Sequence, residues 1–138
     1  MLLALAYWIT LLICAGYALR RGERPEQTGA VLMFIGSIAS VIATSTVRFR
    51  QLEHGIFVVD ALLLVALLVL ALRVDRQWPL WMTGFHAVGL ATHAAMIVRP
   101  EVVPRAYALA QGFWGYPMLI ALVVGTLSLN RRDPAKPF

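Results

Sequence analysis

The chain has 138 residues, of which 60% are hydrophobic and 14% are charged, and its formal net charge is +5. Soluble domains usually contain about 25% charged residues and roughly 45–50% apolar ones, and they alternate apolar with polar positions. The apolar residues here form long uninterrupted blocks, a pattern that excludes an ordinary water-soluble fold.

The first apolar block covers residues 2–19 and contains no charged residue. Its Cys14 is the single cysteine of the chain, which excludes an intrachain disulfide and a Cys-x-x-Cys metal or redox pair. No Lys or Arg precedes Arg20, so the positively charged start of a cleaved signal peptide is missing. We therefore expect this block to be a retained membrane helix.

Four further apolar blocks follow. Their few ionisable residues are Asp60, in the block 55–72, and His86 and His93, in the block 77–98. The blocks cover residues 28–47, 55–72, 77–98 and 106–130. Crossing a hydrocarbon core of ~30 Å takes ~20 residues of helix, so each block is long enough with a normal tilt. Backbone groups in lipid must be satisfied within the segment, which requires helices. The sequence predicts an all-α integral membrane protein, a single five-transmembrane-helix bundle over residues 1–138 without a soluble domain.

Charged tracts in the connections predict the orientation of this bundle. The connections are short, so neighbouring helices should run antiparallel. The first connection, the third connection and the C-terminal tail would share one side, with eight cations: Arg20, Arg21, Arg24, Arg73, Arg76, Arg131, Arg132 and Lys136. The other side would have four: Arg48, Arg50, Arg99 and Arg105. Because cations favour the cytoplasmic side, we predict an outside N-terminus and a cytoplasmic C-terminus in a bacterial inner membrane.

Several residues predict how the helices meet the membrane surface and one another. Trp78 and Trp81 should lie at the cytoplasmic membrane interface, and Pro117 should kink the last helix. Small residues four apart let helices approach closely. They occur at Gly36 and Ser40, Ala87 and Ala91, Ala91 and Ala95, Ala108 and Gly112, and Ala121 and Gly125.

One stripe of the fourth helix contains sulfur and imidazole side chains. Met82, His86, His93 and Met96 share this face, together with Gly89. We interpret the stripe first as packing and hydrogen bonding, and second as a ligand stripe of the kind that suits copper. His86 and His93 are ~10 Å apart along the axis and cannot hold one iron. The sequence therefore predicts no metal site and no cofactor, and haem ligated by His93 with His54 is the alternative.

Polar residues from all five predicted helices fall in the outer half of the bundle: Asp60, His93, Tyr7, Ser40, Thr44 and Gln111. Ionisable residues inside a membrane are costly and are functional candidates by default. The functional interpretation is a binding pocket or a proton-handling site with Asp60 and His93 as an acid–base pair. The structural interpretation is that Asp60 is neutralised by His93, Arg48 or Arg50, while the hydroxyls satisfy local backbone.

Motifs of known enzyme chemistry are missing from the sequence, which has no Gly-x-Ser-x-Gly, no His-Glu-x-x-His and no Gly-rich phosphate loop. We expect a non-catalytic accessory or interaction subunit whose partners are the bilayer and other membrane proteins or further copies of itself, and not nucleic acid. One alternative is a redox subunit that binds haem or quinone through His93 with His54 or Asp60. Another is a small oligomeric transporter or membrane enzyme with an outward-facing pocket around Asp60 and His93.

Overall fold

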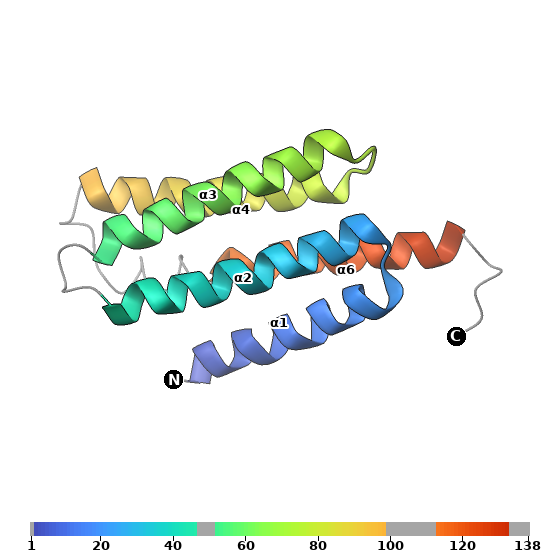
Figure 1. Ribbon diagram of the computed structural model, residues 1–138, viewed down its shortest axis with the longest axis horizontal. Coiled ribbons are helices and arrows are strands. Elements are labelled where there is room, and N and C mark those ends of the chain that lie inside the picture. Colours follow the sequence, from blue (N-terminus) through green and yellow to red (C-terminus); the bar gives the residue numbers. More distant parts are fainter. Residues whose placement is uncertain (1, 47–51, 99–112, 133–138) are drawn as a thin grey trace.

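The described residues of the computed structural model, 2–46, 52–98 and 113–132, form five α-helices and no strand. The helices are α1 (Leu2–Arg21), α2 (Arg24–Thr46), α3 (Leu52–Arg73), α4 (Trp78–Val98) and α6 (Gly115–Arg132). They alternate in direction along the chain, so α1 begins at one end of an elongated bundle and α6 ends at the other (Figure 1). The predicted all-helical bundle is confirmed.

Two of these helices are long and apolar enough to cross a membrane. They cover Arg24–Ala43 and Gly55–Arg73, with mean hydropathies of 1.4 and 2.9. A shorter apolar helix covers Gly115–Leu129.

The start of α2 lies four residues before the predicted segment, and local capping explains the difference. Pro25 is in the first turn, where its missing N–H costs nothing. The Glu26 carboxylate accepts a hydrogen bond from the Glu23 backbone N–H at 3.1 Å, which satisfies a donor that the helix leaves unpaired.

The last helix differs from its prediction in the part that the structure describes. A turn at Trp114 precedes α6, which begins at Gly115, so Pro117 lies in the first turn of a helix. A proline there disrupts no internal hydrogen bond. The predicted segment is thus interrupted at Trp114, three residues before the proline at which a kink was predicted, and residues 106–112 of that segment lie outside the described residues.

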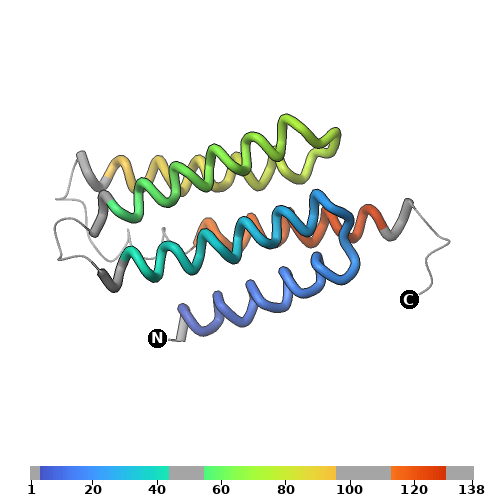
Figure 2. Tube along the Cα trace, viewed as in Figure 1, coloured from blue at the N-terminus to red at the C-terminus, as the bar shows by residue number. Residues whose placement is uncertain are grey.

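Each helix packs against its neighbour in chain order, and α1 also packs against α6, which closes the described helices into a ring. Figure 2 shows α3 and α4 lying together on one side of α2 and α6, with α1 on the other side. A smaller contact joins α2 to α6 across the ring. The large side chains that are fully buried fill the half of the bundle nearest this contact: Leu11, Leu67, Met82, Leu119 and Leu122.

Trp78 is buried inside this packed half of the bundle, and its predicted position at the level of the membrane interface stays a prediction. Only 6% of Trp78 is exposed, whereas 62% of Trp81 is. A Cβ at Gly29 of α2 would come within 2.8 Å of the Trp78 ring, and one at Gly125 of α6 would come within 2.5 Å. The two glycines therefore leave the space that the indole occupies between α2 and α6.

The alanines spaced four apart along α4 do not pack against another described helix. Ala87, Ala91 and Ala95 are exposed on the outer surface of the helix, so the close packing predicted for them does not occur within the described bundle. Gly36, in contrast, allows a close approach by Leu63 of α3, because a Cβ there would lie 2.6 Å from the leucine side chain.

Candidate functional site

Asp60 of α3 and His93 of α4 are in direct contact, with His93 Nε2 at 3.1 Å from Asp60 Oδ2, within hydrogen-bonding distance. Only 15% of the Asp60 side chain and 6% of the His93 side chain are exposed. The imidazole carries a charge only when it is protonated, and in its neutral form its N–H still donates to the carboxylate. A buried carboxylate needs such a partner, because burying an unpaired charge is costly.

His86 of α4 also contacts Asp60, through the Asp60 backbone. Its Nε2 lies 2.9 Å from the backbone carbonyl oxygen of Asp60, to which a protonated nitrogen donates. Both histidines of α4 thus contact one residue of α3, one through its side chain and the other through its backbone. This double contact holds the Asp60 carboxylate in a defined position between the two helices.

Two hydroxyl groups from α1 and α2 form a second polar pair. Tyr7 Oη and Ser37 Oγ are 2.9 Å apart. Only one hydroxyl hydrogen is used between them, so the pair retains a second hydrogen to donate elsewhere. Ser40, one turn further along α2, donates to the backbone carbonyl of Gly36 at 3.0 Å.

Both polar pairs line a cavity of about 690 Å³ that all five described helices surround, which we call the bundle cavity. Its wall includes Tyr7, Ser40, Asp60, His86 and His93, together with Ser37. Five aromatic residues also line it, from α1 and from the segment that leads into and begins α6: Tyr7, Trp8, Phe113, Trp114 and Tyr116. A largely apolar cavity with a few convergent polar groups is the usual form of a small-molecule site.

Four members of the predicted polar cluster therefore share one wall: Tyr7, Ser40, Asp60 and His93. Gln111 and the Thr44 side chain lie outside the described residues. The side chains of His54 and Met96 are also outside the description, so the predicted His54–His93 pair has no described geometry. Whether the cluster binds a ligand or only stabilises the fold stays a prediction.

The predicted ligand stripe divides between two environments. Met82 is fully buried in the packed half of the bundle, whereas His86 and His93 line the cavity and contact Asp60. Within the ranges that the structure describes, no group of three or more His, Cys, Asp or Glu residues could hold a metal ion.

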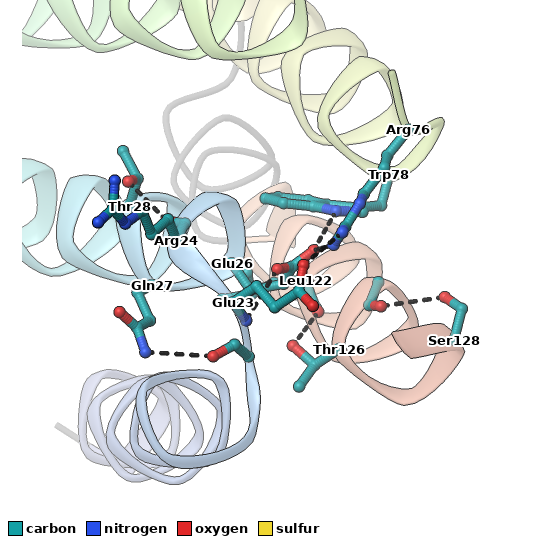
Figure 3. Close-up of polar contacts among 12 residues, drawn as sticks. Glu23, Arg24, Glu26, Gln27, Thr28, Arg76, Trp78, Leu122, Thr126 and Ser128 are labelled. Carbon is teal, nitrogen blue, oxygen red and sulfur yellow. Dashed lines mark hydrogen bonds and ion pairs between the residues drawn. The ribbon is translucent and has the colours of Figure 1, made fainter. Parts of the chain in front are cut away.

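A second polar constellation, which we call the Glu26 cluster, lies at the opposite end of the bundle and consists of Glu23, Glu26, Arg76 and Trp78 (Figure 3). The fully buried Glu26 side chain accepts hydrogen bonds on Oε1 from Arg76 Nη1 at 2.6 Å and from Trp78 Nε1 at 2.9 Å. Arg76 Nη2 donates to Glu23 Oε2 at 2.7 Å. Burial lowers the pKa of Arg76, but its hydrogen bonds to both carboxylates and their charges outweigh this and raise the pKa above its ordinary value.

Sequence reasoning missed the Glu26 cluster and the aromatic wall. Glu26 sits in the first turn of a helix three residues after Glu23, a spacing that resembles a capping box and could have indicated its local bond. Its bonds to Arg76 and Trp78 join positions about fifty residues apart, and no local pattern indicates them. Ser37 was missed because the sequence pointed only to Ser40 on the next turn.

No protein-family model, curated protein or solved structure matches the chain.

Proposed function

We propose that the chain is a five-span inner-membrane protein of a bacterium, with its N-terminus outside and its C-terminus in the cytoplasm. The exposed surface supports this proposal, because large apolar side chains face outward on all five described helices, among them Ile13, Ile35, Leu62, Leu80 and Ile120. Monomeric soluble proteins rarely expose apolar surface on this scale. The split of eight cations against four supports the orientation.

Reporter fusions test this topology directly. Fusions after Arg24 and after Asp75 should report a cytoplasmic location, and fusions after Gln51 and after Val102 should report export. A cytoplasmic signal at Val102 would contradict five spans or their orientation.

Within this framework we propose that the protein binds a small, mostly apolar ligand that carries one polar group. The observation that carries the proposal is the bundle cavity of about 690 Å³, with an aromatic wall and the Asp60–His93 pair on its surface. Aromatic and aliphatic side chains would remove the apolar body of the ligand from lipid and water, and the few polar groups would orient it. The packed half below the cavity favours a binding pocket over a continuous pore.

An accessory role in the membrane is compatible with this activity, because a binding subunit needs no catalytic group of its own. Redox function would require a quinone or haem in the same cavity. The wider apolar surface of α3 would face lipid or neighbouring helices, whether from other membrane proteins or from further copies of this chain.

A fluorescent apolar probe, N-phenyl-1-naphthylamine, tests the binding proposal in the purified, detergent-solubilised protein. We expect saturable binding, seen as energy transfer from tryptophan to the probe, because Trp8 and Trp114 line the cavity. Ser40→Phe should weaken it, because the added ring would occupy part of the cavity. Ile38→Phe is the matched control, since Ile38 is on the same helix but outside the cavity lining, and it should bind as the unmodified protein does.

Two results would contradict the proposal. One is probe uptake no greater than that of empty detergent micelles. The other is equal binding by the Ser40→Phe and Ile38→Phe variants, which would place the probe on the lipid-facing surface.

A further inference from the structure

We infer that the ligand of the bundle cavity is a lipophilic organic cation, an inference that rests on the proposed binding function and specifies its ligand class.

The ionisable side chains on the described cavity wall favour a positive ligand. Asp60 is the carboxylate among the described lining residues, and neither Lys nor Arg occurs among them. Asp60 Oδ2 is paired with His93, whereas Oδ1 has no hydrogen bond or ion pair with any residue in the described ranges. With a neutral imidazole the pair carries a full negative charge, which a monocation would neutralise. An anion would find neither Lys nor Arg on the described part of this wall.

The aromatic residues favour the same class of ligand. Trp8, Trp114 and Tyr116 line the cavity that Asp60 also lines. The faces of such rings attract cations, and the attraction is largest where water is excluded. Cages of aromatic rings with a nearby carboxylate suit bulky cations that cannot donate hydrogen bonds. A volume of about 690 Å³ accommodates several aromatic rings around one charged centre.

Ions of matched shape and opposite charge test the inference. Tetraphenylphosphonium is a cation with four phenyl rings, and tetraphenylborate is an anion of nearly the same shape. We expect isothermal titration of the protein in dodecyl maltoside to show saturable binding of tetraphenylphosphonium, at least about tenfold tighter than that of tetraphenylborate. The cation should also displace N-phenyl-1-naphthylamine.

Substitutions at the cavity wall test which residues cause the preference for the cation. Asp60→Asn keeps a hydrogen-bond acceptor for His93 but removes the charge, so it should weaken tetraphenylphosphonium binding about tenfold or more and abolish the preference for the cation over tetraphenylborate. Glu23→Gln is the control carboxylate, because it is exposed at the far end of the bundle, and it should have no effect. Trp114→Leu should weaken cation binding about threefold to tenfold, whereas Trp81→Leu, outside the cavity lining, should not.

The outcomes separate this inference from the binding function itself. Binding of the neutral probe together with equal affinity for both ions would overturn the inference and leave the proposed function standing. Full cation affinity in Asp60→Asn would also overturn the inference. Failure of every probe to bind would overturn both. Should Asp60→Asn not fold, the comparison of the two ions and the effect of Trp114→Leu decide the outcome.

Discussion

Trp78 donates a hydrogen bond from its indole Nε1 to a carboxylate oxygen of Glu26, at 2.9 Å, and both side chains are buried. This bond joins the start of α4 to the start of α2, and Arg76 adds an ion pair to the same oxygen at 2.6 Å. The connections between α1 and α2 and between α3 and α4 are thereby tied together at one end of the bundle. The bundle cavity and the Asp60–His93 pair occupy the other half.

Removing the indole N–H tests the bond without removing the aromatic ring. Trp78→Phe should lower the free energy of unfolding by about 1.5–3 kcal/mol, because hydrogen bonds to charged groups contribute about that much. Trp81→Phe should change it little, since Trp81 is largely exposed on the next turn of α4. Unfolding by titration with sodium dodecyl sulfate in mixed micelles measures both, and equal effects would mean that the Trp78 bond contributes nothing specific.

The two carboxylates that bind Arg76 differ in burial, so they should differ in their effect on stability. Glu26→Ala should cost on the order of 3–5 kcal/mol, because it leaves Arg76 and Trp78 without their shared acceptor in a buried site. Glu23 is 52% exposed, so Glu23→Ala should cost about 1 kcal/mol or less. The same denaturant titration compares them. A larger loss for Glu23→Ala would contradict the buried position of Glu26.

Gly125 should tolerate no side chain, because a Cβ would lie 2.5 Å from the Trp78 ring. We expect Gly125→Ala to destabilise the protein by about 1–3 kcal/mol through overpacking. Gly84→Ala is the control, since a Cβ there would meet no atom within 4 Å, and helix propensity should make it about 0.5–1 kcal/mol more stable. Thermal unfolding in detergent should show a lower melting temperature for Gly125→Ala and a higher one for Gly84→Ala. In a Trp78→Leu background the cost of Gly125→Ala should be smaller, because the ring that the new methyl group would meet is gone.

The contact between the Asp60 and His93 side chains should appear as a coupling free energy. In a double-mutant cycle, Asp60→Leu and His93→Leu should be non-additive by about 0.5–3 kcal/mol. Asp60→Leu with His86→Leu should be closer to additive. His86 bonds the backbone carbonyl of residue 60, and Asp60→Leu leaves that carbonyl in place. Asp60→Asn should be mild, since an amide still bonds the imidazole. Additivity of the Asp60 and His93 substitutions would mean that their side chains do not interact in the folded protein.

We expect no haem in the purified protein. His86 and His93 are too far apart along α4 to share an iron, and His93 Nε2 already lies 3.1 Å from Asp60. Absorption spectra of protein from haem-replete cells should have no Soret band. A Soret band that disappears in His93→Ala would instead support the redox alternative.

Much of the fold follows from the sequence, because long apolar blocks separated by short charged connections allow only helices that pack side by side. The sequence also indicated that Asp60, His93, Tyr7 and Ser40 lie at similar depth, since depth is counted in residues along each helix. These four side chains do line one cavity. The position of a residue along its helix is thus a local property of the chain.

Which face of each helix points inward was decided only by the tertiary structure. Apolar side chains cover the inner and outer surfaces alike, as fully buried Leu67 and largely exposed Leu62 of α3 illustrate, so the hydrophobic pattern does not distinguish them. Trp78 is buried because Gly29 and Gly125, from two other helices, leave room for its ring. Burying a charge is costly unless it has partners. Glu26 can be buried beside Trp78 because Arg76 and Trp78 both donate to its carboxylate, and both come from a distant part of the chain.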